Sequence, residues 1–190
     1  MKLRKPTSRR VLTTLAVVVT VAAAAVVWQN LPTPTDVLGP FEIHGEAGTP
    51  VTGRAVSASV TGVRVSPDVN GTKPAGIWVV VDTALEGTVS TELPHSKLIA
   101  GPNTYTPSDV FSLDTLGGVM INPELTLSGS YVFDVVPALV APDAKGPLVF
   151  QLWVGDSRLD SLLVIRIPID DQWVHRVDQV TLERPEVTAS

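Results

Sequence analysis

The segment GIWVVVDTAL, residues 76–85, decides the fold that this sequence predicts. It is a nearly continuous run of apolar and β-branched residues, which favour extended backbone. A run of this length without polar alternation is typical of a central strand that is covered on both faces. We therefore predict a buried strand here.

Strands are also predicted on both sides of this segment, because apolar residues recur there with a period of two. Val56, Ala58 and Val60 alternate with serine and threonine, and residues 130–136 and 148–154 also alternate between two faces. Residues 162–167 give a last strand that ends at Pro168. Connections rich in proline and glycine separate these segments. The pattern predicts an all-β fold, an immunoglobulin-like antiparallel β-sandwich over residues 54–168. Its predicted core includes Trp78, Val80, Phe133, Phe150 and Trp153.

A second apolar segment lies near the start of the chain, where residues 11–28 (VLTTLAVVVTVAAAAVVW) contain no charge. Eighteen helical residues span ~27 Å, close to the roughly 30 Å of a bilayer core. We predict a single transmembrane helix, with Trp28 at the outer interface. Its anchoring residues are Val11, Leu12, Leu15, Val18, Val27 and Trp28. The alternative is a signal peptide, cleaved for instance after Ala25.

Charge is distributed unevenly along the chain, and this predicts the orientation of the helix. The leader, residues 1–10, contains no acid and five basic residues: Lys2, Arg4, Lys5, Arg9 and Arg10. The excess of positive charge keeps the N-terminus in the cytoplasm, so we expect a single-pass protein of the cell membrane with an extracytoplasmic C-terminal domain. Five of the 14 Lys and Arg lie in the leader, so 9 remain against 19 Asp and Glu, a net charge of −10. Such a surface makes nucleic acid a poor candidate partner.

Two segments flank the predicted sandwich. Residues 29–53 are rich in proline and glycine and predict a spacer and lead-in, with a short edge strand at Phe41 and Ile43. Residues 169–190 form an acidic C-terminal tail, for which two interpretations stay open. The tail is either solvated, or it docks on the body or on a partner through Trp173.

Four stretches of the predicted body resemble one family of domains. They are residues 76–85, SKLIAGPNTY (96–105), LSGSYVFDVVP (127–137) and GPLVFQLWV (146–154). They are similar to the bacterial immunoglobulin-like accessory domains of unknown function, found on membrane-anchored envelope proteins and in secreted actinobacterial antigens. The resemblance covers residues 54–168 and implies an envelope location and a binding or accessory role, with no catalytic residues. This chain differs from many relatives in having a membrane anchor instead of a lipid-bearing cysteine.

Motifs of known chemistry are missing from the sequence. The chain has no cysteine, which excludes disulfides, thiol catalysis and iron–sulfur ligation. His44, His95 and His175 do not have metal-ligand spacing, and no nucleophile elbow or phosphate-binding loop occurs. We predict no catalytic residue, no cofactor and no metal site.

The predicted contact surface lies in the long loops, residues 101–124 and 137–147, since binding residues concentrate on loops of rigid scaffolds. Candidate contact residues are Tyr105, Phe111 and Trp173. The expected function is a non-enzymatic binding or accessory module of the bacterial cell envelope that contacts another envelope protein. The alternatives are an exported domain that binds a small ligand, and an envelope hydrolase whose active-site residues are distant in sequence.

Overall fold

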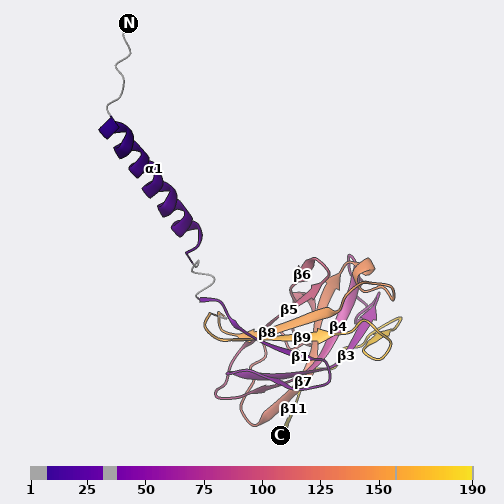
Figure 1. Ribbon diagram of the computed structural model, residues 1–190. Coiled ribbons are helices and arrows are strands. Elements are labelled where there is room, and N and C mark those ends of the chain that lie inside the picture. The colour runs from indigo at the N-terminus through magenta and orange to yellow at the C-terminus, as the bar shows by residue number, and fades with distance from the viewer. Residues whose placement is uncertain (1–7, 32–37, 157, 190) are drawn as a thin grey trace. The chain divides into compact units, whose positions relative to one another are not determined.

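The computed structural model describes residues 8–31, 38–156 and 158–189 (Figure 1). The chain forms two compact units, Met1–Gly39 and Pro40–Ser190. Among the described residues, the long helix lies in the first unit and the strands lie in the second. The predicted division into helix and sheet is therefore confirmed.

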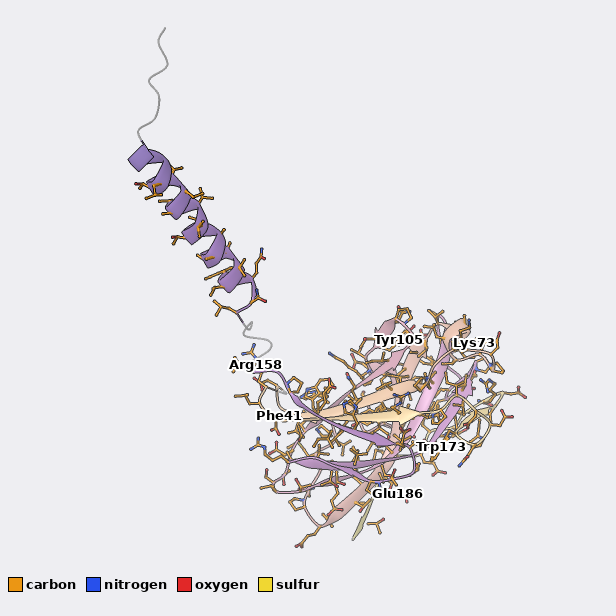
Figure 2. All side chains as sticks on the ribbon, in the orientation of Figure 1. Phe41, Lys73, Tyr105, Arg158, Trp173 and Glu186 are labelled. Carbon is orange, nitrogen blue, oxygen red and sulfur yellow. The ribbon has the colours of Figure 1, made fainter. Side chains whose placement is uncertain are left out.

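The helix α1 spans Ser8–Gln29, and its side chains project on all sides (Figure 2). Its 22 residues correspond to ~33 Å, enough to cross the hydrocarbon core of a bilayer. The window Leu12–Gln29 has a mean hydropathy of 2.0, which a membrane anchor and a signal sequence share. Of the predicted orienting residues, Lys2, Arg4 and Lys5 lie outside the described residues, whereas Arg9 and Arg10 fall within α1.

The strands of the second unit form two sheets. The five-stranded sheet has the order β1-β9-β8-β5-β6, and the other has the order β10-β3-β4-β7-β11 with β2 paired to β3. The bounds are β1 Phe41–Glu46, β2 Val51–Thr52, β3 Val56–Ser66, β4 Ile77–Gly87, β5 Pro94–Ala100, β6 Asn103–Tyr105, β7 Leu125–Val135, β8 Leu148–Val154, β9 Ser161–Ile167, β10 Val174–Arg176 and β11 Glu186–Ala189. Two 3₁₀ turns, η1 (Asp109–Phe111) and η2 (Pro137–Leu139), flank β7.

The order of the strands is that of an immunoglobulin-like sandwich. The chain makes the β3–β4 hairpin, crosses to β5 and β6, returns to place β7 beside β4, and crosses again to place β8 beside β5. The central pairings are antiparallel, as predicted. The pairs β1–β9 and β10–β3 are parallel instead, because β1 and β10 enter from segments outside the predicted body and run along an edge of each sheet.

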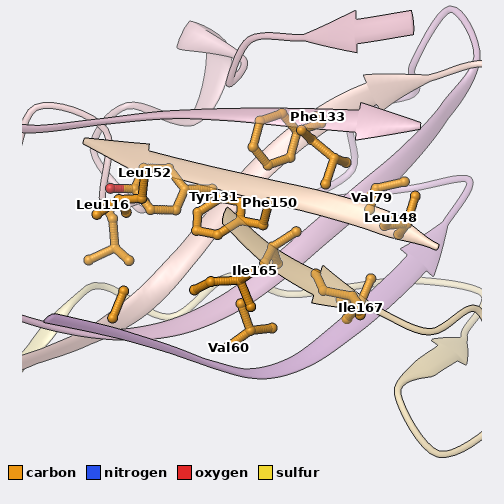
Figure 3. Packing of buried hydrophobic residues seen from close by; sticks show 14 of the residues in the cluster. Val60, Val79, Leu116, Tyr131, Phe133, Leu148, Phe150, Leu152, Ile165 and Ile167 are labelled. Atoms are coloured by element: carbon orange, nitrogen blue, oxygen red, sulfur yellow. The ribbon is translucent and has the colours of Figure 1, made fainter. Parts of the chain in front are cut away.

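The core between the sheets is built by alternate residues of each strand. Phe133 and Phe150 are fully buried and meet with ring centroids 6.4 Å apart, and Tyr131 lies 5.6 Å from Phe150 (Figure 3). Both phenylalanines were predicted to lie in this core, and the structure confirms it.

The predicted core residues of β4 are also buried, but on the other side of their sheet. Trp78 and Val80 belong to a second cluster on the outer face of the six-stranded sheet, with Val132 from β7 and Val180 and Leu182 from the C-terminal segment. The inward positions of β4, such as Val79, belong to the main core. This confirms that the apolar run is a strand covered on both faces.

The prediction that Trp153 lies in the core is wrong. Leu152 and Val154 point inward from β8, so the alternation of the strand turns Trp153 to the outer face of the five-stranded sheet. There it is half-buried, stacked on His95 at 5.8 Å, with the Lys97 ammonium 5.2 Å from its ring centroid.

The folded body is wider than the predicted residues 54–168. The predicted spacer and lead-in, residues 29–53, contributes β1 and β2, and the predicted tail contributes β10 and β11. Of the two interpretations of the tail, docking on the body is the one observed. Trp173 packs against the main core, where a Cβ on Gly48 would lie 2.6 Å from its ring.

Candidate interaction surface

Residues 106–124, which join β6 to β7, cover part of the outer face of the six-stranded sheet. Two backbone hydrogen bonds hold this loop against β7. The Ser108 N–H donates to the carbonyl oxygen of Val132 at 2.7 Å, and the Leu116 N–H donates to that of Ser130 at 3.0 Å. We call residues 106–124 the β6–β7 loop.

Phe111 fastens the first half of this loop to the sheet. Its ring meets Trp78 edge-on, with centroids 5.2 Å apart, and only 5% of the residue is exposed. Trp78 is held in turn by its indole N–H, which donates to the carbonyl oxygen of Thr72 at 2.9 Å. The prediction of Phe111 as a contact residue is therefore wrong, because the apolar outer face of β4 needs a cover and Phe111 supplies it.

Leu116 anchors the second half of the β6–β7 loop by packing into the main core. Its side chain is fully buried and belongs to the main core cluster. It approaches β7 at Gly129, where an added Cβ would lie 3.0 Å from its Cγ atom. The loop is thus anchored at two points five residues apart in sequence, 111 and 116, which restricts its conformations.

Between and beside these anchors, the β6–β7 loop displays two large apolar side chains. Val110 is 67% exposed and Leu113 is 83% exposed. Val110 lies within η1, and Leu113 follows two residues after its end. The Ser108 hydroxyl caps η1 by accepting from the Val110 N–H at 3.4 Å. Exposed apolar residues on a fixed loop are characteristic of a binding surface.

A polar groove of about 510 Å³ lies over β3, β4 and β7. Arg64 donates to both carboxylate oxygens of Asp82, from Nε at 2.9 Å and from Nη2 at 2.6 Å, and the Ser130 hydroxyl donates to Asp82 at 2.6 Å. Residues of the C-terminal segment line the groove as well, among them Arg184. Arg184 lies 3.7 Å from Asp114, so an ion pair connects the groove to the β6–β7 loop.

The other predicted contact residues lie elsewhere on the body. The Tyr105 hydroxyl in β6 accepts from the side-chain amide of Asn103 at 3.1 Å and from the Val136 N–H at 3.3 Å. It therefore ties β6 to the end of β7. Trp173 is half-buried before β10. The structure does not bring Tyr105, Phe111 and Trp173 together.

The three histidines occupy separate strands, His44 in β1, His95 in β5 and His175 in β10. Within residues 8–31, 38–156 and 158–189, no group of three or more His, Asp and Glu is placed to hold a metal ion.

The predicted contact surface in residues 101–124 and 137–147 stays a prediction, but one of its candidate residues, Phe111, is buried. Val110 and Leu113 were missed because the loop has no period from which an inward and an outward side can be read. One signal could have predicted that part of this loop is buried. Strand β4 is apolar on both faces, so its outer face must be covered by a segment distant in sequence.

Comparison of the chain with family models, with curated protein sequences and with solved structures gave no match.

Proposed function

We propose that this protein is a membrane-anchored, extracytoplasmic binding module of the bacterial cell envelope, which acts without catalysis and contacts another envelope protein. The observation that carries the proposal is the β6–β7 loop, which is anchored at Phe111 and Leu116 and displays Val110 and Leu113 to solvent. The resemblance to bacterial immunoglobulin-like accessory domains supports the same role.

A protein is the partner that this surface fits. The displayed apolar pair lies in the same loop as Asp114, whose ion pair with Arg184 leads to a groove rich in charged and hydroxyl groups. Protein interfaces combine an apolar centre with a polar rim in this way. Because the loop is held in place before binding, little conformational entropy is lost when a partner docks on it.

Membrane location is supported by α1 and by the basic leader. The helix is long and apolar enough to cross a bilayer, and the five basic residues before it favour retention of the N-terminus in the cytoplasm. In this orientation the sandwich lies outside the cytoplasm, where its partner must also be.

Site-specific photocross-linking in intact cells tests the proposal. A photoreactive residue at position 113 of the full chain should capture one discrete envelope protein, and Val110→Ser in the same chain should reduce the yield several-fold. The matched control places the photoreactive residue at Val89, which is 73% exposed on a different loop. Equal capture from both positions, or none from position 113, contradicts the proposed contact.

The polar groove favours a second candidate function, the binding of a small polar ligand. Its floor presents the bidentate Arg64–Asp82 pair and the Ser130 hydroxyl, which are groups that orient a hydrogen-bonding ligand. A screen of sugars and peptides by thermal shift separates the candidates. A ligand whose stabilisation is lost in Ser130→Ala but kept in Leu113→Ser would favour the groove over the loop.

A further inference from the structure

One end of the sandwich carries two exposed apolar side chains. Phe41, the first residue of β1, is 64% exposed, and Leu159, in the turn between β8 and β9, is 52% exposed. They are neighbours, because Phe41 pairs with Ser161 and its N–H donates to the carbonyl oxygen of Asp160 at 2.8 Å. We call Phe41 and residues 158–159 the tip of the sandwich.

The backbone of Leu159 has a conformation that is unfavourable for leucine. Its φ of 51° lies in the left-handed region, where a large side chain is strained. Among the described residues, the other non-glycine residues with positive φ are Asn70 and Glu124, which are polar. Glycine or asparagine at position 159 would relieve the strain and remove an apolar side chain from water. An exposed leucine at a strained position therefore indicates a contact outside the chain.

Phe41 does not contribute to the core either. In β1, Ile43 packs against the main core cluster. Phe41 lies two residues earlier and on the same face of the strand, but in the described part of the chain it belongs to neither buried cluster. Its ring therefore lies beyond the end of the core, at the point where the chain enters the sandwich.

Charged groups surround the tip. Arg54 donates to both carboxylate oxygens of Asp160, at 3.0 Å and 2.5 Å, and Arg158 is exposed. A pocket of about 260 Å³, lined in part by Asp156, separates the tip from Val89. Apolar side chains surrounded by charged groups match the lipid–water interface, where the apolar groups reach the acyl chains and the charged groups stay among the headgroups.

We infer that the tip contacts the outer surface of the bilayer that α1 crosses, with Phe41 and Leu159 inserted at the lipid–water interface. Residues 30–40 join α1 to β1, and eleven residues extend to about 40 Å at most. Because this connection enters the sandwich at Phe41, the tip is the part of the sandwich that the connection keeps closest to the bilayer. The inference rests on the membrane anchoring of the proposed function.

The contact orients the sandwich and does not anchor it. Two apolar side chains are too few to hold a free domain on a membrane, but the helix keeps the tip at a high local concentration of lipid. Strand β3 begins two residues after Arg54, beside the tip, and ends at Ser66, which pairs with Trp78. The end of the sandwich where Phe111 packs on Trp78 is thereby directed away from the bilayer. Figure 2 shows Phe41 and Arg158 at one end of the sandwich and Lys73 at the other.

Fluorescence quenching of the full chain in phosphatidylcholine vesicles tests the inference. Because the chain has no cysteine, Leu159→Cys can be labelled with an environment-sensitive fluorophore. A nitroxide-labelled phosphatidylcholine should quench this label several-fold more strongly than the same label at Val136→Cys. Val136 is the matched control, because it is 47% exposed and follows the last residue of β7, which pairs with Ile77 at the end of β4 away from the tip.

Removal of the second apolar side chain then tests the contact itself. Phe41→Ser should reduce the quenching at position 159 several-fold, whereas Val110→Ser, which changes an exposed residue outside the tip, should leave it unchanged. Equal quenching at positions 159 and 136, in protein that floats with the vesicles, overturns the inference alone. A protein that fails to float contradicts the membrane anchoring and with it the proposed function, so the two failures are distinguishable.

Discussion

Tyr131 places a phenol ring in the centre of the sandwich core, and its hydroxyl has no hydrogen-bond partner among the described residues. Burial raises the pKa of this hydroxyl, so it stays neutral. A buried hydroxyl without a partner loses its hydration without compensation. The aromatic ring of Tyr131 therefore stabilises the core by packing, whereas its hydroxyl group does not.

We therefore expect Tyr131→Phe to raise the free energy of unfolding by about 1 kcal/mol. Tyr105→Phe is the matched control, because its hydroxyl accepts two hydrogen bonds and its loss should lower the free energy by a similar amount. Urea denaturation of the two variants measures both effects. A destabilised Tyr131→Phe protein would mean that the hydroxyl has a partner.

The ionised Asp160 carboxylate should make the free energy of unfolding depend on pH. Hydrogen bonds from Arg54, at 3.0 Å and 2.5 Å, lower the pKa of this carboxyl below its ordinary value of 3.8. A carboxyl whose pKa is lower in the folded state contributes stability above the unfolded-state pKa, and loses it as the pH falls through the folded-state pKa.

Asp160→Asn should therefore be less stable than the wild type at about pH 7, and the gap should close below about pH 4. Denaturation curves at several pH values measure the gap. A gap of constant size across this range would contradict a role of the ionised carboxylate.

Among the elements of the fold, the β6–β7 loop depends most on tertiary contacts. Its inward and outward residues alternate irregularly, with Phe111 and Leu116 buried and Val110 and Leu113 exposed. Contacts with Trp78 and with Gly129 select this arrangement. Without contacts to the sheet, nothing would offset the conformational entropy that the loop loses in this arrangement.

Phe111→Ala should lower the free energy of unfolding by about 3 kcal/mol, because it removes a buried ring. It should also expose residues 106–124 to limited proteolysis. Leu113→Ala should change stability by less than about 0.5 kcal/mol, because this side chain is exposed. Melting curves and a protease time course compare the two. Equal sensitivity of both variants would contradict the division into an anchoring and a displayed residue.

On the scale of the whole molecule, the two units differ in structure. The helix provides an apolar segment of bilayer length, and the sandwich provides surfaces on a rigid scaffold. Under the proposed function, the basic leader before the helix favours retention of the N-terminus in the cytoplasm.

Cysteine labelling measures the proposed topology, since the natural chain has no cysteine. Val89→Cys should react with a membrane-impermeant maleimide in intact cells, whereas Lys2→Cys should react only after the membrane is permeabilised. Both variants should remain in the membrane fraction. Loss of position 2 from a mature protein in the soluble fraction would instead identify a cleaved signal peptide.

By itself, the sequence determined the class of the main segments: an apolar helix over residues 11–28, and strands over residues 56–65, 76–85, 130–136, 148–154 and 162–167, each of which overlaps the helix or a strand of the structure. These features depend on local periodicity and apolar length, which neighbouring residues encode. Only the tertiary structure decided that Phe111 is buried, that Trp153 faces outward and that β10 and β11 extend the six-stranded sheet. These outcomes depend on contacts between residues far apart in the chain, because an irregular segment takes its inward side from whichever apolar surface it covers.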